Sequence, residues 1–449
     1  MRTPWIRTWT AARTGAVKRR CGAVAAALVF AGSAAPAAAA PAEEVRVREA
    51  YVSLRGADAP GPAAADRIRV LKAGSPRARQ VLVLEPGQFA AAGSLAPVAR
   101  ELAARLPDTE VWAVDRREQN LADLDGFRRP PDRAADHYLG GHYRSRTPQS
   151  VPYVGEWGLA LELADLREVV SAARDGGRRR VVLGGHSWGG TIALAYAGWD
   201  FDGRPGYRDL SGLVLLDAGV HDAFAGEGVT YRLTAEQAQA WRARIEGGEV
   251  FDEALNMGRT ETYAILMQLA GGYANAAPDR PSTLVAHLPS WLRPPDGTAV
   301  TNLGLVEWLY ATHPMVPDIS INPEFTPPAT LARALASPEP ALYQWYWPSR
   351  LTLDLQAADP FDDTAVARGL GLRLRHTREI DVPLYSFQTG LTHGTVNTSA
   401  RWVVGQSRIT SATYAENESM THLDPLFAAP GRNTFVDTVV PFLTGLGRR

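Results

Sequence analysis

Residues 181–196 read Val-Val-Leu-Gly-Gly-His-Ser-Trp-Gly-Gly-Thr-Ile-Ala-Leu-Ala-Tyr, and the rest of the chain is interpreted outward from them. An apolar, β-branched run typical of a buried strand leads into Gly185-His-Ser-Trp-Gly189, and an alanine-rich helical pattern follows at once. In such a strand–G-x-S-x-G–helix arrangement the chain reverses so sharply that side chains at Gly185 and Gly189 would collide. The turn holds Ser187 in a strained conformation with its hydroxyl above the sheet edge. We therefore predict that Ser187 is a nucleophile; the alternative is a tight turn without chemistry.

Short apolar runs alternate with helical patterns on both sides of this stretch. The patterns predict strands at 44–54, 68–74, 81–84, 110–115 and 211–217, and helices at 95–106 and 156–174. Further along, they predict strands at 380–387 and 408–414 and a helix at 433–446, which we expect to kink or end near Pro441. Strands and helices that alternate at this spacing predict the α/β class, with a doubly wound and mostly parallel sheet.

The alternation stops between residues 220 and 376. This segment shows helical patterns at 235–245 and 252–269, several proline-rich loops and no strong strand. We therefore expect a core made of 41–219 and 377–449, with 220–376 inserted as a mainly helical cap or lid. Its aromatic residues, among them Trp291, Trp308 and the run 343–348, would wall an apolar pocket or pack the insertion onto the core.

The first 40 residues have the pattern of a secretory signal peptide. Six basic and no acidic residues accompany a short apolar stretch, and alanine-rich cleavage sites follow. We expect secretion, by the Sec route rather than the twin-arginine route despite Arg19-Arg20; an N-terminal membrane anchor is the alternative. Cys21, the only cysteine, lies in this segment, so the mature chain would hold no disulfide, thiol nucleophile or cysteine-ligated metal.

Composition and charge limit the partners. Lys and Arg number 47 and Asp and Glu 48, so loss of the basic leader leaves a mildly acidic chain, which argues against nucleic acid. No later segment approaches the length of a membrane span. The chain has no dinucleotide-binding fingerprint or P-loop, and His137 and His142 lack the carboxylate pattern of a metal site. We expect no cofactor and no metal.

Taken together, these features resemble the α/β-hydrolase family, with a helical cap inserted after the sixth strand. The resemblance covers about 45–220 and 376–449 and is carried mainly by Gly185-His-Ser-Trp-Gly189. It implies a catalytic triad in the order nucleophile, acid, histidine, with the histidine between the last strand and the last helix. Of nine histidines only His422 lies in that interval, so it is the expected proton shuttle.

The acid of the triad is less directly indicated. Much of the family carries it after the seventh strand, but residues 388–397 contain no Asp or Glu. Some members carry it at the end of the sixth strand, where this chain has Asp217, and we predict Asp217 on that ground. The alternatives are Asp381, Glu416 and Asp424; Asp424 is so close to His422 in sequence that a capping role suits it better.

The resemblance also implies an oxyanion hole made of two backbone amides. By position these belong to Trp188, directly after the nucleophile, and to Gln88 in the loop after the third strand, with Phe89 as the nearest competitor. Gly87 would let that loop approach the substrate closely. The alternative is that 86–88 form an ordinary strand-to-helix turn.

The function that follows is a secreted serine hydrolase that cleaves a carboxylic ester through an acyl-enzyme, as esterases, lipases and lactonases do. Its substrate would be a small apolar ester or a peptide-like molecule. The first alternative is an aminopeptidase similar to proline iminopeptidases, which would need cap carboxylates such as Glu253, Glu261 or Glu307 to hold a free amino terminus. The second is a non-catalytic binding module. A serine nucleophile excludes the dehalogenase and epoxide-hydrolase branches, which need aspartate there.

Overall fold

The computed structural model describes residues 47–252, 260–295, 298–314 and 319–447. The predicted signal peptide, Cys21 and Glu253 lie outside these ranges. The chain divides into a unit up to Arg46 and a unit from Val47 onward, and the description below concerns the second. Within the described ranges, no helix has the length and apolar character that a membrane crossing requires.

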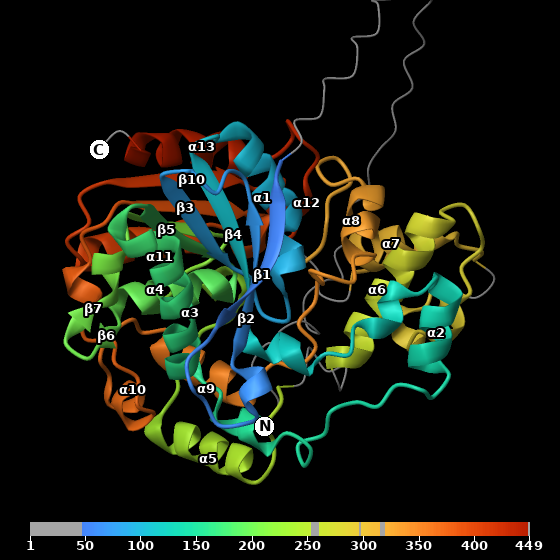
Figure 1. The fold of residues 1–449 in the computed structure, drawn as a ribbon, viewed down its shortest axis with the longest axis horizontal. Coiled ribbons are helices and arrows are strands. Elements are labelled where there is room, and N and C mark those ends of the chain that lie inside the picture. Colours follow the sequence, from blue (N-terminus) through green and yellow to red (C-terminus); the bar gives the residue numbers. More distant parts are fainter. Residues whose placement is uncertain (1–46, 253–259, 296–297, 315–318, 448–449) are drawn as a thin grey trace, which may run out of the picture. The chain divides into compact units, whose positions relative to one another are not determined.

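An eight-stranded sheet forms the centre of this unit (Figure 1). Its strands are β1 (Glu49–Arg55), β2 (Arg67–Ala73), β3 (Gln80–Glu85), β4 (Thr109–Asp115), β5 (Arg180–His186), β8 (Gly212–Leu216), β9 (Leu384–Thr389) and β10 (Ala412–Asn417). They lie in the order β1-β2-β4-β3-β5-β8-β9-β10, and all neighbours are parallel except β1 with β2 and β2 with β4. The predicted class and the mostly parallel sheet are confirmed, and β3 and β4 are buried along their whole length as continuous apolar runs predict.

Helices cover both faces of the sheet. On one face α1 (Ala92–Arg105) contacts α13 (Thr434–Gly447), and on the other α3 (Leu159–Arg174) contacts α4 (Trp188–Gly198) (Figure 1). The helix predicted at 433–446 is confirmed as α13, which continues through Pro441 rather than ending there and has a buried face that includes Phe435, Val439 and Leu443. Burial of an apolar face stabilises a helix more than propensity does, so the proline is accommodated.

One helix that the sequence patterns do not predict, α11 (Thr395–Gln406), packs against β9 and β10. Its first half is rich in β-branched and polar residues that lower helix propensity, and tertiary packing outweighs them. The last strand also differs slightly from expectation. Regular pairing of β10 begins at Ala412, whereas Arg408 makes only a single backbone hydrogen bond, to Ile380.

The segment between β8 and β9 is helical and contains nothing longer than an isolated β-bridge in its described part. Its helices are α5 (Ala235–Glu246), α6 (Thr260–Ala276), α7 (Asn302–Glu307), α8 (Pro328–Leu335), α9 (Ser349–Ala358) and α10 (Ala365–Gly369). Helices α6, α7 and α8 pack together, joined by α2 (Pro131–Leu139) from an earlier part of the chain, whereas α9 packs on α3, α4 and α5 (Figure 1). That 220–376 acts as a separate cap or lid stays a prediction.

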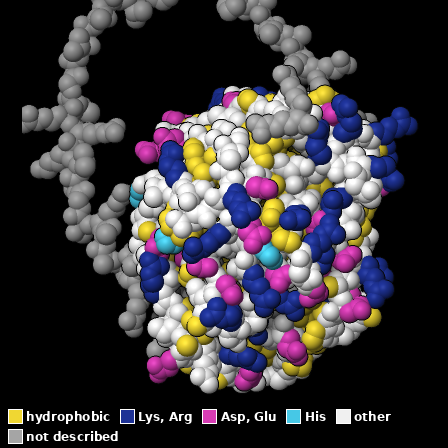
Figure 2. Space-filling model, turned by 90° about the vertical axis from the view of Figure 1, so that its left-hand side faces the viewer, with side chains coloured by type: hydrophobic (Ala, Val, Ile, Leu, Met, Phe, Trp, Pro, Cys, Tyr) yellow, Lys and Arg dark blue, Asp and Glu magenta, His cyan; other side chains and the backbone are white. Residues whose placement is uncertain are grey.

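The face shown in Figure 2 carries both signs of charge. Arginine and lysine side chains alternate with aspartate and glutamate, and apolar side chains are scattered between them. Surface ion pairs among the described residues include Arg373 with Asp202 and Arg378 with Asp362. A mixed surface of this kind differs from the single-sign patch of a nucleic-acid-binding face.

Candidate active site

Ser187 occupies the turn between β5 and α4. Its backbone has φ 55° and ψ −130°, a left-handed conformation that costs a non-glycine residue about 1–3 kcal/mol. A Cβ at Gly185 would lie 2.2 Å from the carbonyl carbon of Gly189, and one at Gly189 would lie 2.2 Å from the carbonyl oxygen of Glu85. Gly185 is therefore required by the turn itself, whereas Gly189 is required by the close approach of the end of β3. Ser187 is half-buried, whereas its neighbours in the sequence, His186 and Trp188, are buried.

The carboxyl ends of β5, β8, β9 and β10 meet at one edge of the sheet, because these strands are parallel. Ser187 follows β5 and Asp217 follows β8, while His422 lies in the loop between β10 and α12 (Asp424–Phe427). The topology thus brings to one edge three residues that are far apart in the sequence.

Asp217 and His422 are both buried and joined by a hydrogen bond. The distance from His422 Nδ1 to Asp217 Oδ2 is 2.6 Å. Asp217 also accepts hydrogen bonds from Thr389, from the backbone nitrogen at 2.9 Å and from Oγ1 at 2.5 Å. With Nδ1 engaged, Nε2 is the ring nitrogen of His422 that remains to exchange a proton with another group.

Thr389 is a residue that the sequence analysis missed. It ends β9, at the place where much of the family carries its acid, and it holds Asp217 instead. The absence of Asp and Glu from 388–397 was a sign in the sequence that the residue at the end of this strand does not supply the acid itself. A hydroxyl and an amide of Thr389 thus fix the position of the Asp217 side chain.

Among the described residues, the carboxylate that is hydrogen-bonded to His422 is Asp217, and the other candidate acids have different surroundings. Asp381 and Glu416 are exposed. Asp424 is buried, but its oxygens accept from the backbone nitrogens of Thr421 and Asn322 and from Thr326 Oγ1, at 2.7 to 2.9 Å. Asp424 thus ties the loop that carries His422 to residues 322–326, and it does not cap α12, which begins at Asp424 without a side-chain cap.

His186, inside the G-x-S-x-G motif, supports the same loop. Its Nε2 lies 2.9 Å from the carbonyl oxygen of His422, and the two rings are 4.2 Å apart. Burial, together with the neighbouring His422, keeps the pKa of His186 well below its ordinary value. The ring is therefore neutral at pH 7, and Nε2 carries the hydrogen, because a carbonyl oxygen can only accept.

The loop at 86–91, between β3 and α1, approaches Ser187 from the other side. A Cβ at Gly87 would lie 3.0 Å from Ser187 Cβ, so the loop passes close to the serine at this residue. Ala90 N donates to the carbonyl oxygen of Gly87 at 3.3 Å, and Phe89 has φ 57°. The side chain of Gln88 donates to Asp252 Oδ2 at 3.4 Å, which leaves its backbone amide as the group relevant to an oxyanion.

Aromatic side chains gather around these two turns. Trp347 packs edge-on against Phe89 at 5.8 Å and against Trp188 at 6.1 Å, and Tyr231 lies 6.0 Å from Trp188. Only part of the predicted aromatic set takes part, since Trp291 is exposed near His313 and Trp308. Apolar walls beside Ser187 favour an uncharged acyl or aromatic group.

Within the described ranges, no group of three or more His, Cys, Asp or Glu is arranged to hold a metal ion. His137 lies 3.3 Å from Asp123, and His142 is 4.0 Å from Asp136, so each faces a single carboxylate.

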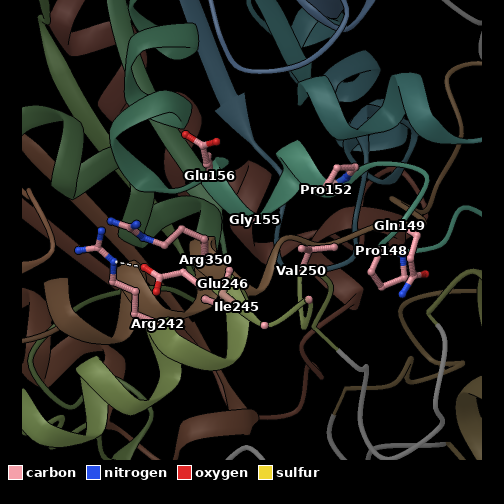
Figure 3. Close-up of a pocket in the computed structure, with 12 residues that line it drawn as sticks. Pro148, Gln149, Pro152, Gly155, Glu156, Arg242, Ile245, Glu246, Val250 and Arg350 are labelled. Atoms are coloured by element: carbon pink, nitrogen blue, oxygen red, sulfur yellow. Dashed lines mark hydrogen bonds and ion pairs between the residues drawn. The ribbon is translucent and has the colours of Figure 1, made fainter.

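A cavity of about 680 Å³ opens elsewhere, between α5, α9 and residues 148–156 (Figure 3). Its walls combine Ile245 and Val250 with charged side chains that are already paired, Arg242 with Glu246 and Arg350 with Asp354. None of the predicted site residues lines it, and we assign it no part in the chemistry at Ser187.

The fold of the chain was compared with the folds and sequences of known proteins. No family model matches the chain, and no curated protein matches it. A solved structure of a candidate lipase from Sulfolobus solfataricus does match, with a TM-score of 0.54 and 18% identity over 89% of this chain and 94% of that one. The chain has the α/β-hydrolase fold. At this identity the likeness concerns the fold alone.

Two further solved structures share the α/β-hydrolase fold at lower similarity. A thioesterase domain from the curacin biosynthetic pathway has a TM-score of 0.43 and 14% identity, covering 88% of this chain and 99% of that one. Epoxide hydrolase A from Mycobacterium thermoresistibile has a TM-score of 0.42 and 14% identity, covering 89% and 99%. We draw no functional argument from either.

Proposed function

We propose that this α/β-hydrolase is a serine hydrolase that cleaves a carboxylic ester through an acyl-enzyme, with Ser187, His422 and Asp217 as its triad. The observation that carries the proposal is the 2.6 Å hydrogen bond between His422 Nδ1 and Asp217, at the sheet edge where the strained turn presents Ser187. A serine is a weak nucleophile unless an oriented base takes its proton. In the buried pair, the imidazole of His422 would be this base and the carboxylate of Asp217 would orient it.

In the proposed reaction Ser187 Oγ attacks the ester carbonyl carbon while His422 Nε2 takes the serine proton. Asp217 keeps Nδ1 protonated and stabilises the imidazolium that forms. The carbonyl oxygen becomes an oxyanion, which the backbone amides of Trp188 and Gln88 would stabilise. His422 then gives the proton to the departing alcohol, and a water molecule repeats the sequence to release the acid and regenerate Ser187.

The aromatic walls formed by Phe89, Trp188 and Trp347 favour an apolar acyl or alkoxy group in the substrate. The second candidate function is cleavage of an aminoacyl amide, and one observation favours it. Asp252 reaches the side chain of Gln88, so a carboxylate lies beside the loop that approaches Ser187. Of the carboxylates expected for that role, Glu307 is exposed and Glu261 is buried in α6.

The test is to measure labelling by a fluorophosphonate probe and turnover of aryl esters of increasing acyl length, beside aminoacyl-arylamides. We expect labelling and ester turnover in the wild type. Ser187→Ala should abolish the labelling and lower turnover by about 10⁶-fold. Ser211→Ala is the matched control. Ser211 precedes β8 and therefore lies at the amino ends of the parallel strands, whereas Ser187 lies at their carboxyl ends. A wild type that is not labelled and turns over neither substrate would leave only the non-catalytic binding module.

We also propose that the protein is exported with removal of about 40 residues, on the basis of the basic and apolar pattern of its N-terminal segment. Mass spectrometry of the protein from culture supernatant and from cells tests this. The proposal would be refuted if the protein were found only in cells and only at its full length.

A further inference from the structure

Arg116 directly follows β4, and its guanidinium is completely buried beneath the loop at 86–91. We propose that Arg116 is a positioning residue for the reaction, holding this loop so that its backbone amide faces the substrate carbonyl oxygen at Ser187. The inference rests on the proposed function and adds to it a residue that the sequence analysis did not single out.

The guanidinium donates to several carbonyl oxygens of this one loop. Nη2 donates to the carbonyl oxygen of Pro86, and Nη1 lies 3.3 Å from that of Gly87 and 3.4 Å from that of Ala90. Nη1 also donates to Gln344 Oε1 at 3.0 Å. Because a guanidinium is planar and rigid, contacts to successive carbonyls set the orientation of the backbone between them.

The orientation of a carbonyl determines that of the next amide. A trans peptide is planar, and its C=O and N–H point in opposite directions. When Arg116 holds the Gly87 carbonyl on the buried side of the loop, the amide N–H of Gln88 is directed away from Arg116. A side chain at Gly87 would have no room, since its Cβ would lie 3.0 Å from Ser187 Cβ, so small rotations of this peptide would move the amide relative to the substrate. Arg116 thus acts on the candidate oxyanion hole without touching the substrate.

The loop needs stabilising contacts of this kind because part of its backbone conformation is intrinsically unfavourable. Phe89 has a positive φ, which is unfavourable for a residue with a bulky side chain. A second contact, from Gln344 N to the carbonyl oxygen of Phe89 at 2.9 Å, fixes the other side of the turn. Gln344 therefore contacts both the loop and Arg116, so the three form one connected unit.

Arg116 is in turn held by charge and by an aromatic ring. Its Nε lies 3.4 Å from a carboxylate oxygen of Glu85 and 3.4 Å from one of Glu162, and its guanidinium lies 5.1 Å from the ring centre of Trp347. Burial raises the pKa of Glu85 and that of the nearby Glu118 to about 7, and Arg116 opposes the rise. Groups packed this closely leave the arginine little freedom to move.

Arg117 provides a matched control. It is also buried, it pairs with Asp165 at 2.6 Å and with Asp66 at 3.0 Å, and it lies over the ring of Trp157. Its backbone acceptor is Ala57 rather than any residue of the loop. Replacement of either arginine removes a buried cation, but only replacement of Arg116 removes a contact with the loop.

The experiment compares Arg116→Gln, Arg116→Lys and Arg117→Gln with the wild type, using turnover of a short aryl ester, rate of fluorophosphonate labelling and thermal unfolding. We expect Arg116→Gln to lower kcat by about 10- to 100-fold with KM changed by less than about threefold, because a misplaced oxyanion donor affects the transition state more than binding. Arg116→Lys, which keeps the charge but not the fork of donors, should recover part of the loss. Arg117→Gln should lower the unfolding temperature and leave kcat of the folded fraction within about threefold.

Gln344→Met keeps Arg116 and removes one of its acceptors, so it tests the same inference if Arg116→Gln does not fold. We expect a smaller fall in kcat, again with KM little changed. The inference is overturned if folded Arg116→Gln or Gln344→Met retains wild-type kcat, or if Arg117→Gln loses kcat equally. A wild type without labelling or turnover refutes the proposed function, and with it this inference; an active wild type with unaffected variants refutes the inference alone.

Discussion

The turn at 185–190, called the elbow below, carries Ser187, and the loop at 86–91 lies beside this serine. The contacts that shape the two segments come from residues at different distances along the chain. In the elbow a Cβ at Gly185 would meet Gly189, four residues away, although one at Gly189 would meet the remote Glu85 at the end of β3. In the loop the carbonyl of Gly87 is held by Arg116 and that of Phe89 by Gln344, which belongs to the helical segment before β9. A turn made by its own glycines leaves a motif in the sequence. A turn held by remote side chains does not.

Because the two segments are held differently, substitutions in the elbow and in the loop should affect stability and rate differently. The elbow has no free space, so an added methyl group there must displace backbone. The loop is held by hydrogen bonds, so a change there should shift the amide and lower the rate while the fold survives. The following predictions test this difference, from the largest expected effect to the smallest.

Gly185→Ala should prevent folding or lower the free energy of unfolding by more than about 4 kcal/mol, because its Cβ would lie 2.2 Å from a backbone carbon of Gly189. Urea unfolding followed by circular dichroism measures this. Gly405→Ala in α11 is the control, since a Cβ there meets nothing within 4 Å, and it should be neutral or stabilising. A stable, active Gly185→Ala would show that the elbow is less constrained than its geometry indicates.

Asp217→Asn should fold and lower kcat by about 10⁴-fold, because an amide cannot hold the imidazole of His422 in the same tautomer. Ester turnover at saturating substrate measures the effect. Asp381→Asn, at an exposed position, should keep wild-type activity. Near-normal turnover by Asp217→Asn would assign the acid to another residue.

Gly87→Ala should fold normally and lower kcat by about tenfold or more, since its Cβ would lie 3.0 Å from Ser187 Cβ and push the loop away from the serine. Comparison of kcat and unfolding temperature with those of Gly185→Ala tests the contrast directly. The contrast fails if Gly87→Ala loses stability as strongly as Gly185→Ala does.

The smallest effects concern how stability depends on pH, and the two regions should respond in opposite directions. Burial lowers the pKa of His186 in the folded state, so its contribution to stability is present above about pH 6.5 and is lost as the pH falls below that value. Burial raises the pKa of Glu162, which packs against Arg116, so its contribution is present below about pH 4.5 and is lost as the pH rises.

Urea unfolding between pH 5 and pH 8.5 tests this with His186→Gln and Glu162→Gln. The stability of the wild type relative to Glu162→Gln should fall as the pH rises, by at most about 1.4 kcal/mol per pH unit. Relative to His186→Gln it should fall as the pH drops below about 6.5. Parallel curves for wild type and variant would contradict the corresponding shift in pKa.

Much of the fold could be predicted from the sequence because its signals are local. Apolar runs located the strands of the sheet, and the β-branched run before Gly185 located the turn at Ser187. His422 could be singled out because the order of elements leaves one histidine between the last strand and the last helix. The patterns failed where packing outweighs local preference, as in α11.

The sequence by itself determined the turn at Ser187, since the glycines that permit it stand beside it in the chain. It left Asp217 as one of four possible acids. Only the tertiary structure set Asp217 against His422, with Thr389 completing its hydrogen bonds, and only the tertiary structure placed Arg116 and Gln344 under the loop at 86–91. The physical reason is that these partners lie tens to hundreds of residues apart. Their side chains meet only after the parallel sheet has aligned the carboxyl ends of its strands and the helical segment has packed against them.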